Sequence, residues 1–207
     1  MGRSQRWRTA GRRRAASALV ALSLVAGLAA CSNDPLAEEY RSGDNKGYVA
    51  GQFKVVEIPE EERGEPIRFE GTTDSGLTVT SADYAGEVLV VNFWYAGCGP
   101  CRAEAKYLEQ VAREYDGKGA SFLGLNIYDQ PATATSFART YDVTYPSLIA
   151  IDDAKLKLAF AAAAPLSATP VTLVLDREGR VAARIISQLE DASILSTLVR
   201  ETLAESS

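Results

Sequence analysis

The sequence predicts an α/β fold, in which a central mixed sheet is flanked by helices and preceded by an added N-terminal β-hairpin. An unbroken apolar run at residues 88–94 is typical of a strand buried on both faces, and a helical pattern follows it. A second apolar run at 121–128 completes the order strand, helix, strand, which implies a parallel pair with a right-handed crossover. Residues 171–175 and 181–186 flank a polar turn and predict an antiparallel hairpin.

The length and composition fit one soluble globular domain with appendages. The chain has 207 residues, of which 46% are hydrophobic and 24% are charged. Its net charge is −5, and its first 31 residues hold only basic charges, so the remaining body is more acidic than the whole chain. This acidic balance argues against binding to nucleic acid. We find no internal repeat, and we expect a monomer.

The first 31 residues predict a targeting signal. A basic region ends at Arg14, and the apolar stretch 15–30 is too short for a comfortable transmembrane span. The stretch ends in Leu-Ala-Ala before Cys31, which resembles a bacterial lipobox, in which the cysteine is lipidated and becomes the first mature residue. A plain signal peptide with an incidental cysteine and an uncleaved anchor are the alternatives. The pattern favours a lipoprotein on the outer face of the cell membrane.

The chain is therefore divided into three parts. Residues 1–31 are the predicted signal peptide, residues 32–51 are polar and predict a flexible tether, and residues 52–207 form the predicted folded domain. With Cys31 acylated, Cys98 and Cys101 are the thiols that remain, in an extracytoplasmic compartment where disulfides persist.

The first elements of the domain are predicted from local patterns. Residues 52–58 alternate as an edge strand, and residues 59–64 form a charged loop. Residues 66–71 and 77–80 flank a cluster of turn residues and predict the added hairpin. Ser81 is expected to cap a single helical turn that follows.

The later elements follow in the same way. The helix after the central strand is expected to end near Tyr115, before Asp-Gly-Lys-Gly. Residues 132–141 predict a second helix, and the alanine-rich residues 155–164 a third. Residues 145–153 are apolar and then acidic, and no element is assigned to them. A closing amphipathic helix is expected after a capping Asp191, with its inward positions at Ile194, Leu195, Leu198, Val199 and Leu203.

Two cysteines stand where the central strand turns into the first helix. There the backbone N–H groups of the first helical turn point at the sulfur, and the helix dipole stabilises a thiolate. A lowered thiol pKa makes a cysteine nucleophilic near neutral pH. The C-x-x-C spacing lets Cys101 bond to Cys98, so the pair can cycle between dithiol and disulfide. Pro100 fits the first turn, where its missing N–H is not needed.

Other uses of a C-x-x-C pair fit this chain less well. A zinc site needs two more ligands, yet the chain has no histidine and Cys31 lies in a different region. Haem attachment requires a histidine where Arg102 stands. An inert structural disulfide stays open as an alternative, although its short loop would add little stability. The sequence therefore predicts a redox-active dithiol and no bound metal.

Longer stretches of the domain resemble the TlpA/ResA-like family of the thioredoxin superfamily. The resemblance rests on residues 86–94, on C-G-P-C-R-A-E-A at 98–105 and on T-P-x-x-x-x-x-D-x-x-G at 169–179. With the predicted hairpin it covers roughly residues 65–205. Members of this family are membrane-tethered, extracytoplasmic thiol–disulfide oxidoreductases of bacteria. The resemblance therefore implies a thioredoxin-like fold and this activity and location.

The resemblance assigns catalytic roles to three residues. Cys98 would be the nucleophile and Cys101 the resolving thiol. Glu104 lies one helical turn after Cys101 and would exchange protons with it as a general acid and base. A solvated helix glutamate is the alternative.

Substrate contacts are implied for five more residues. Pro170 would be a cis-proline that faces the dithiol and presents the backbone of Thr169 to a bound substrate strand. An ordinary trans proline is the alternative. Trp94, Gly99 and Pro100 would line the same surface, with Trp94 packing beside the site rather than taking part in chemistry.

Three positions distinguish the chain from its relatives. Asn92 stands where thioredoxins proper carry a buried aspartate, so that proton relay is absent. Gly97 replaces the family's tryptophan before the first cysteine, and we expect it to remove an aromatic wall and loosen the backbone. Lys106 replaces a proline, and we expect it to reduce a helix kink and to shift pKa values near the site.

The direction of electron flow is predicted from the residues between the cysteines. Gly-Pro is the pair found in reducing thioredoxins, and the histidine of strongly oxidising relatives is missing, so we expect a reductant near about −270 mV rather than about −120 mV. The chain has no flavin or nicotinamide motif, so we expect no cofactor beyond the Cys98–Cys101 disulfide. A membrane thiol carrier of the CcdA/DsbD type would recharge it. The resemblance suggests disulfides of exported proteins, including apocytochrome c, as substrates.

Two other functions remain open. A thiol peroxidase of the peroxiredoxin kind shares the fold, but its peroxidatic cysteine sits in a different local pattern. A tethered, non-catalytic binding lipoprotein with a structural disulfide is the other alternative, in which Gly97 and Lys106 would mark lost activity.

Overall fold

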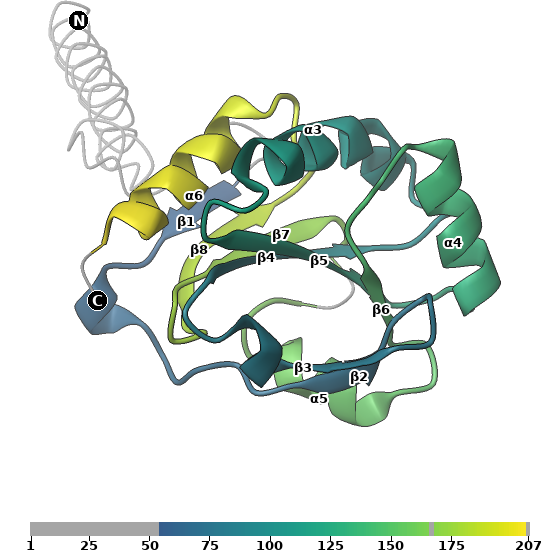
Figure 1. Ribbon diagram of the computed structural model, residues 1–207, viewed down its shortest axis with the longest axis horizontal. Helices are drawn as coiled ribbons and strands as arrows, with labels where there is room; N and C mark the ends of the chain where they lie inside the picture. The colour runs from purple at the N-terminus through teal and green to yellow at the C-terminus, as the bar shows by residue number, and fades with distance from the viewer. Residues whose placement is uncertain (1–53, 166–167, 206–207) are drawn as a thin grey trace, which may run out of the picture. The chain divides into compact units, whose positions relative to one another are not determined.

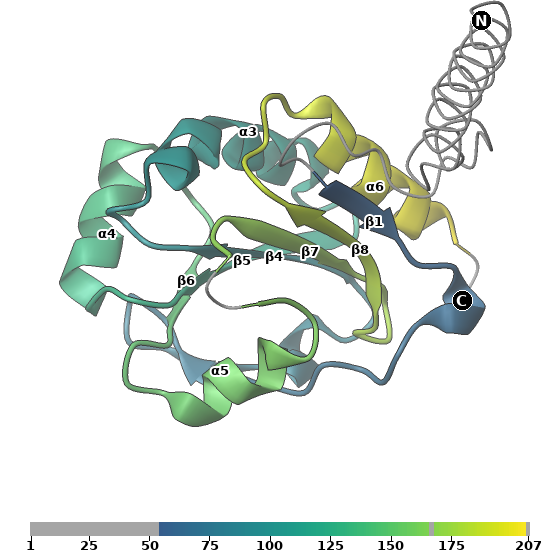
Figure 2. The same cartoon turned by 180° about the vertical axis from the view of Figure 1, so that it is seen from behind.

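Strand β4 (Val88–Trp94) lies near the centre of a six-stranded sheet, and all seven of its residues are buried. The sheet has the strand order β1-β8-β7-β4-β5-β6 (Figures 1 and 2). Strand β4 pairs in parallel with β5 (Ala120–Asn126) and antiparallel with β7 (Val171–Leu175), so the sheet is mixed, as predicted. The computed structural model describes residues 54–165 and 168–205.

The other strands extend the sheet on both sides. Strand β8 (Val181–Ile186) pairs with β7 as the predicted hairpin, and β1 (Lys54–Glu57) adds to β8 as an antiparallel edge strand. On the other side β6 (Ser147–Ile149) pairs in parallel with β5. The hairpin of β2 (Glu70–Thr72) and β3 (Thr78–Thr80) forms a separate two-stranded sheet.

Helices cover both faces of the six-stranded sheet (Figure 1). Helices α3 (Gly99–Tyr115) and α6 (Ser193–Ala204) pack on one face, where Val88 and Val90 point into the core. Helix α5 (Ala154–Ala161) and the β2–β3 hairpin pack on the other face of the sheet. Helix α4 (Pro131–Thr140) follows β5 and contributes Ala134 and Phe137 to a third cluster beside the cysteines.

The β2–β3 hairpin forms backbone hydrogen bonds with β6, which is the last strand of the six-stranded sheet. Thr73 forms an antiparallel bridge with Leu148, and Asp74 N donates to the Ser147 carbonyl over 2.8 Å. Ser147 N in turn donates to Asp74 Oδ1 over 3.3 Å. The hairpin therefore occupies hydrogen-bonding positions that an edge strand would otherwise present to solvent.

The structure differs from the local predictions in three places. Strand β6 was not predicted, since three residues after Pro146 are too few to show a period. The turn at Ser81–Tyr84 is a 3-10 helix capped by Thr80, whose backbone N–H and hydroxyl both donate to Asp83. A second 3-10 helix, Glu60–Glu62, replaces part of the predicted charged loop.

The closing helix begins one position later than predicted. Ala192 is its N-cap, and Asp191 instead accepts hydrogen bonds from the backbone N–H and the hydroxyl of Ser193. The predicted inward face is confirmed, because Leu195, Leu198 and Val199 are buried.

The predictions for residues 1–51, including the signal peptide, the lipidation of Cys31 and the tether, lie outside the described residues. Within the part of the chain that is described, no helix is long and apolar enough to span a bilayer.

Candidate active site

The two cysteines lie at the beginning of helix α3 and form a disulfide, with their Cα atoms 5.2 Å apart. Cys98 is the N-cap residue, and Cys101 N donates to Cys98 Sγ over 3.1 Å. Gly99 and Pro100 form the first helical turn between them. The predicted placement at a strand–helix junction is therefore confirmed, and an N–H group at the positive end of the helix points at the sulfur.

Trp94 packs against the dithiol, as predicted. It is 5% exposed, lies in one cluster with Cys98 and Cys101, and its ring centroid lies 4.2 Å from that of Phe137. Its Nε1 donates to Ser147 Oγ over 3.2 Å. Ser147 was not predicted as a site residue, because the strand that carries it was not predicted.

Glu104 is fully buried, which contradicts the alternative of a solvated helix glutamate. Asn92 Nδ2 donates to Glu104 Oε1 over 2.9 Å, and Leu189 N donates to Oε2 over 2.8 Å. Asn92 Nδ2 also donates to Thr172 Oγ1 over 3.1 Å. The carboxyl group is therefore held from β4 and from the segment before α6, and through Asn92 it is linked to β7.

Burial raises the pKa of Glu104 to about 7, and the N–H groups of Leu189 and Asn92 oppose that rise by stabilising the charged form. A carboxyl group that titrates near neutral pH can both donate and accept a proton. Glu104 follows Cys101 by one helical turn, so its position is compatible with proton exchange with that thiol.

The peptide bond between Thr169 and Pro170 is cis, as predicted. Val171, the first residue of β7, pairs with Phe93 near the end of β4. The Thr169–Pro170 segment therefore lies at the same end of the sheet as Cys98. Its contact with a substrate strand remains a prediction, as do the substrate contacts of Trp94, Gly99 and Pro100.

A second loop supports the segment between β4 and α3. Asp129 Oδ2, in the loop after β5, accepts from Ala96 N over 2.6 Å and from Asn126 Nδ2 over 2.8 Å. Next to it, the rings of Tyr95 and Tyr128 meet edge to face, with centroids 5.1 Å apart. None of these contacts was predicted, because they depend on how the two loops pack in the folded chain.

The structure describes the surroundings of Gly97 and Lys106. A Cβ built at Gly97 would lie 3.3 Å from Tyr95 Cε2, so the Tyr95 ring lies beside this position. Lys106 is exposed, with Nζ 4.6 Å from the Tyr107 ring centroid, whereas burial, Leu189 and Asn92 set the pKa of Glu104. Helix α3 runs unbroken past Lys106.

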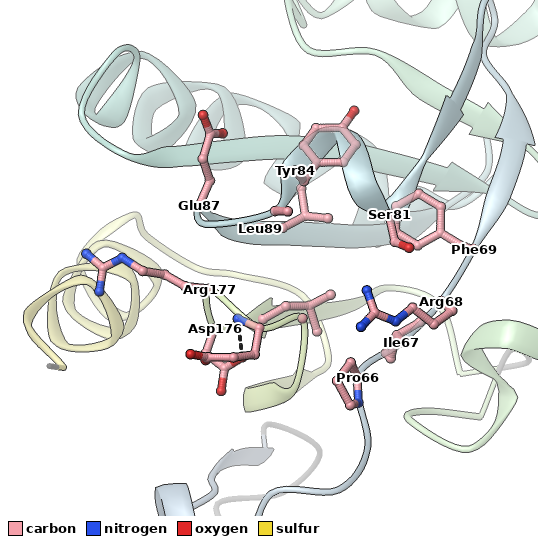
Figure 3. Close-up of a pocket in the computed structure, with 14 residues that line it drawn as sticks. Pro66, Ile67, Arg68, Phe69, Ser81, Tyr84, Glu87, Leu89, Asp176 and Arg177 are labelled. Atoms are coloured by element: carbon pink, nitrogen blue, oxygen red, sulfur yellow. Dashed lines mark hydrogen bonds between the residues drawn. The ribbon is translucent and has the colours of Figure 1, made fainter. Parts of the chain in front are cut away.

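The cavity beside the Cys98–Cys101 disulfide is too small for a small-molecule substrate. The hollow beside Cys101 has about 10 Å³, which is the scale of one water molecule. A larger cavity of about 330 Å³ lies at the start of β4, beside Leu89, at the opposite end of that strand from Cys98 (Figure 3). Its Arg177 donates to carbonyl groups at the end of α6.

Metal binding finds no support in the described residues, where no group of three or more His, Cys, Asp or Glu side chains could hold an ion.

The Redoxin family profile matches residues 52–198, which are well over half of the chain. The chain belongs to the Redoxin family. This Redoxin protein is 27% identical over 124 residues to a thiol-disulfide oxidoreductase ResA of Bacillus cereus, a match that covers 60% of this chain and 69% of that protein. It is 30% identical over 99 residues to ResA of Geobacillus thermodenitrificans, covering 48% and 54% of the two chains.

Solved structures agree with this assignment. A DsbF homologue from Corynebacterium diphtheriae is 29% identical, with a TM-score of 0.63 and coverage of 71% of this chain and 92% of that one. A secreted thiol-disulfide isomerase from Corynebacterium glutamicum is 24% identical, with a TM-score of 0.67 and coverage of 73% and 92%, and supports the fold alone. The Redoxin domain thus has the predicted thioredoxin-like fold, and the protein is a thiol–disulfide oxidoreductase.

Proposed function

We propose that this oxidoreductase works as a reductant of disulfides in exported proteins. The observation that supports thiol–disulfide exchange at Cys98 is its placement as the N-cap of α3, with the Cys101 N–H directed at its sulfur. In the reduced protein, the same N–H and the helix dipole stabilise a Cys98 thiolate. Cys98 is therefore the nucleophile and Cys101 the resolving thiol.

The reaction proceeds through two exchanges. Cys98 Sγ attacks a substrate disulfide, a new sulfur–sulfur bond forms, and the second substrate sulfur leaves as a thiolate that takes up a proton. Cys101 Sγ then attacks Cys98 Sγ, which releases the first substrate thiol and closes the Cys98–Cys101 disulfide. The substrate gains two electrons and two protons. Glu104 takes the proton that Cys101 loses, because its pKa of about 7 matches this task.

The direction is supported by the Gly-Pro pair between the cysteines and by the lack of histidine in the chain. Thr169 and Pro170, at the end of the sheet where Cys98 lies, would present backbone to the substrate strand, with Trp94, Gly99 and Pro100 beside it. No cofactor other than the Cys98–Cys101 disulfide takes part in this scheme.

The location and partners are supported by the leader and by the relatives' names. The basic and apolar N-terminal segment that ends at Cys31 supports anchoring of a monomer by lipid to the outer face of the cell membrane. Exported proteins, including apocytochrome c, are then the proposed substrates, and a CcdA/DsbD-like membrane thiol carrier is the proposed electron donor.

The deciding experiment is the reduction potential of the Cys98–Cys101 couple, measured by equilibrating the purified protein with thiol buffers. A value near or below about −220 mV supports a reductant, while a value near about −120 mV would make it an oxidant of newly exported chains. A Cys101→Ser variant should trap substrates as mixed disulfides on Cys98. Turnover of hydrogen peroxide would favour a thiol peroxidase, and a disulfide that resists reduction down to about −300 mV without trapped partners would favour a binding lipoprotein.

A further inference from the structure

The loop that carries Cys98 lies between two other loops at one end of the sheet. The strand order β7-β4-β5 places the Thr169–Pro170 segment on one side of it and the loop that holds Tyr128 on the other. Trp94 pairs with Asn126 at this end of β4 and β5, so both strands stop at the same level. A polypeptide that crosses Cys98 beyond Thr169–Pro170 therefore reaches the Tyr128 loop.

An aromatic pair lies at that position, with Tyr128 exposed and Tyr95 partly buried. The Tyr95 and Tyr128 rings are nearly perpendicular, at 83°, with centroids 5.1 Å apart. Tyr128 is 53% exposed, which makes it one of the few large apolar side chains in the described residues with such exposure. Leaving half of a tyrosine ring in water forgoes favourable burial, and a partner that covers it would recover that free energy.

The pair is held in place before any partner binds. Gly97 leaves room for the Tyr95 ring, since a Cβ there would lie 3.3 Å from Cε2. Asp129, next to Tyr128, accepts from Ala96 N over 2.6 Å and so ties the two loops together. A rigid aromatic surface loses little conformational entropy on binding.

We propose that the Tyr95–Tyr128 pair determines substrate specificity by binding an apolar side chain close to the target cysteine of an extended polypeptide. This inference rests on the proposed function of the dithiol. Tyr95 lies on the same loop as Cys98, which argues that the pair binds a residue of the substrate itself. A substrate side chain one or two residues from the attacked cysteine lies within about 7 Å of that cysteine along the chain. The exposed Tyr128 ring offers apolar area beside Tyr95, which suits leucine, phenylalanine or tyrosine rather than a charged group.

The test compares two synthetic disulfide peptides that differ only in the residue after cysteine, leucine in one and glycine in the other. Rate constants for reduction by the reduced full-length protein are measured for wild type, Tyr128→Ala and Tyr128→Phe. We expect wild type to prefer the leucine peptide by about three- to tenfold, the factor that an aromatic contact provides. Tyr128→Ala should bring the ratio near one, and Tyr128→Phe should keep it.

Leu158→Ala is the matched control, because Leu158 is 74% exposed on α5, which packs on the other face of the sheet from α3. It should keep the wild-type ratio. The inference is overturned if wild type reduces both peptides at the same rate, or if Tyr128→Ala keeps the preference. Cystamine, a disulfide without a peptide, tests the proposed function separately from the specificity of the Tyr95–Tyr128 pair. If the wild-type protein reduces neither cystamine nor either peptide, it is not a disulfide reductase.

Discussion

Asn92 and Glu104 share a hydrogen bond of 2.9 Å in the interior, between the central strand and the helix that begins at the dithiol. The second Glu104 oxygen accepts from Leu189 N, so both oxygens of a fully buried carboxyl group have a donor. Neither donor carries a charge, and burial consequently outweighs them and raises the pKa to about 7. The carboxyl group can thus change its charge within the physiological range.

Glu104 should make the stability of the protein fall as pH rises. Its pKa of about 7 in the folded protein exceeds the ordinary value of 4.5, so the native state holds more protons than the unfolded chain between these values. Its contribution is complete below about pH 4.5 and is lost as pH rises through about 7. Urea unfolding of the oxidised protein at about pH 5 and about pH 8 measures this.

The matched variant is Glu104→Gln, which cannot ionise. Relative to this variant, the free energy of unfolding of wild type should fall by at most about 1.4 kcal/mol per pH unit between about pH 4.5 and about pH 7. Parallel stability curves for the two proteins would contradict the assignment of the titration to Glu104.

Asn92→Leu should raise the pKa of Glu104 further. The amide of Asn92 stabilises the charged carboxylate, and its removal leaves Leu189 N as the remaining donor to Glu104 among the described residues. Loss of the buried amide contacts should also reduce the free energy of unfolding by about 1–3 kcal/mol. A ¹³C NMR titration of the Glu104 carboxyl carbon measures the pKa directly.

Thr172→Val is the control, because it removes the other partner of Asn92 and leaves the Asn92–Glu104 hydrogen bond in place. The pKa of Glu104 in Thr172→Val should stay close to its pKa in wild type. A larger shift in Thr172→Val than in Asn92→Leu would argue that the amide is not what holds the carboxylate.

Gly124→Ala should disturb the contact between Trp94 and Ser147 beside the cysteines. A Cβ on Gly124 would collide with Ser147 Oγ and lie 2.7 Å from Trp94 Nε1, so the hydrogen bond between these side chains cannot keep its geometry. We expect a loss of about 1–3 kcal/mol in unfolding free energy and a shift of the Trp94 indole N–H resonance. Gly64→Ala, where a Cβ meets nothing within 4 Å, should stay within about 0.5 kcal/mol of wild type.

Asp129→Ala should loosen the loop between β4 and α3. It leaves Ala96 N and Asn126 Nδ2 without their shared acceptor, at an expected cost of about 1–3 kcal/mol. Hydrogen exchange at the Ala96 amide should become faster. Asp129→Asn keeps one side-chain oxygen, so its exchange rate should be intermediate, and equal rates in all three proteins would show that Asp129 does not order this loop.

The parts of the fold that could be predicted are those whose signal is local. Strand β4 and helix α3 have apolar residues at the spacing of their own period, and the dithiol position follows from their junction. Strand β6 has only three residues, and its pairing with β5 and with Asp74 stabilises it from outside its own sequence. The caps at Thr80 and Ala192 differ by one position from the predictions, because neighbouring polar residues compete for the same N–H groups.

The active site shows the same division. Cys98, Cys101 and Glu104 lie on or at the start of one helix. The C-x-x-C spacing pointed to the two cysteines, and the resemblance to the TlpA/ResA-like family pointed to Glu104. The donors to Glu104 are 12 and 85 residues away, and Tyr128 reaches Tyr95 from the loop after the next strand, so only tertiary packing creates these contacts. The same tertiary packing buries Glu104, which its place in the helix alone does not predict.

The bridge between Thr73 and Leu148 has a consequence for the proposed function, in which the protein meets exported chains that are not yet fully folded. A free sheet edge is a template on which such chains can add strands and start to aggregate. Here the hairpin already occupies positions at the β6 edge, through the bridge and the Asp74–Ser147 hydrogen bonds. In the proposed function, an incoming chain is thereby kept from adding a strand to the sheet at β6.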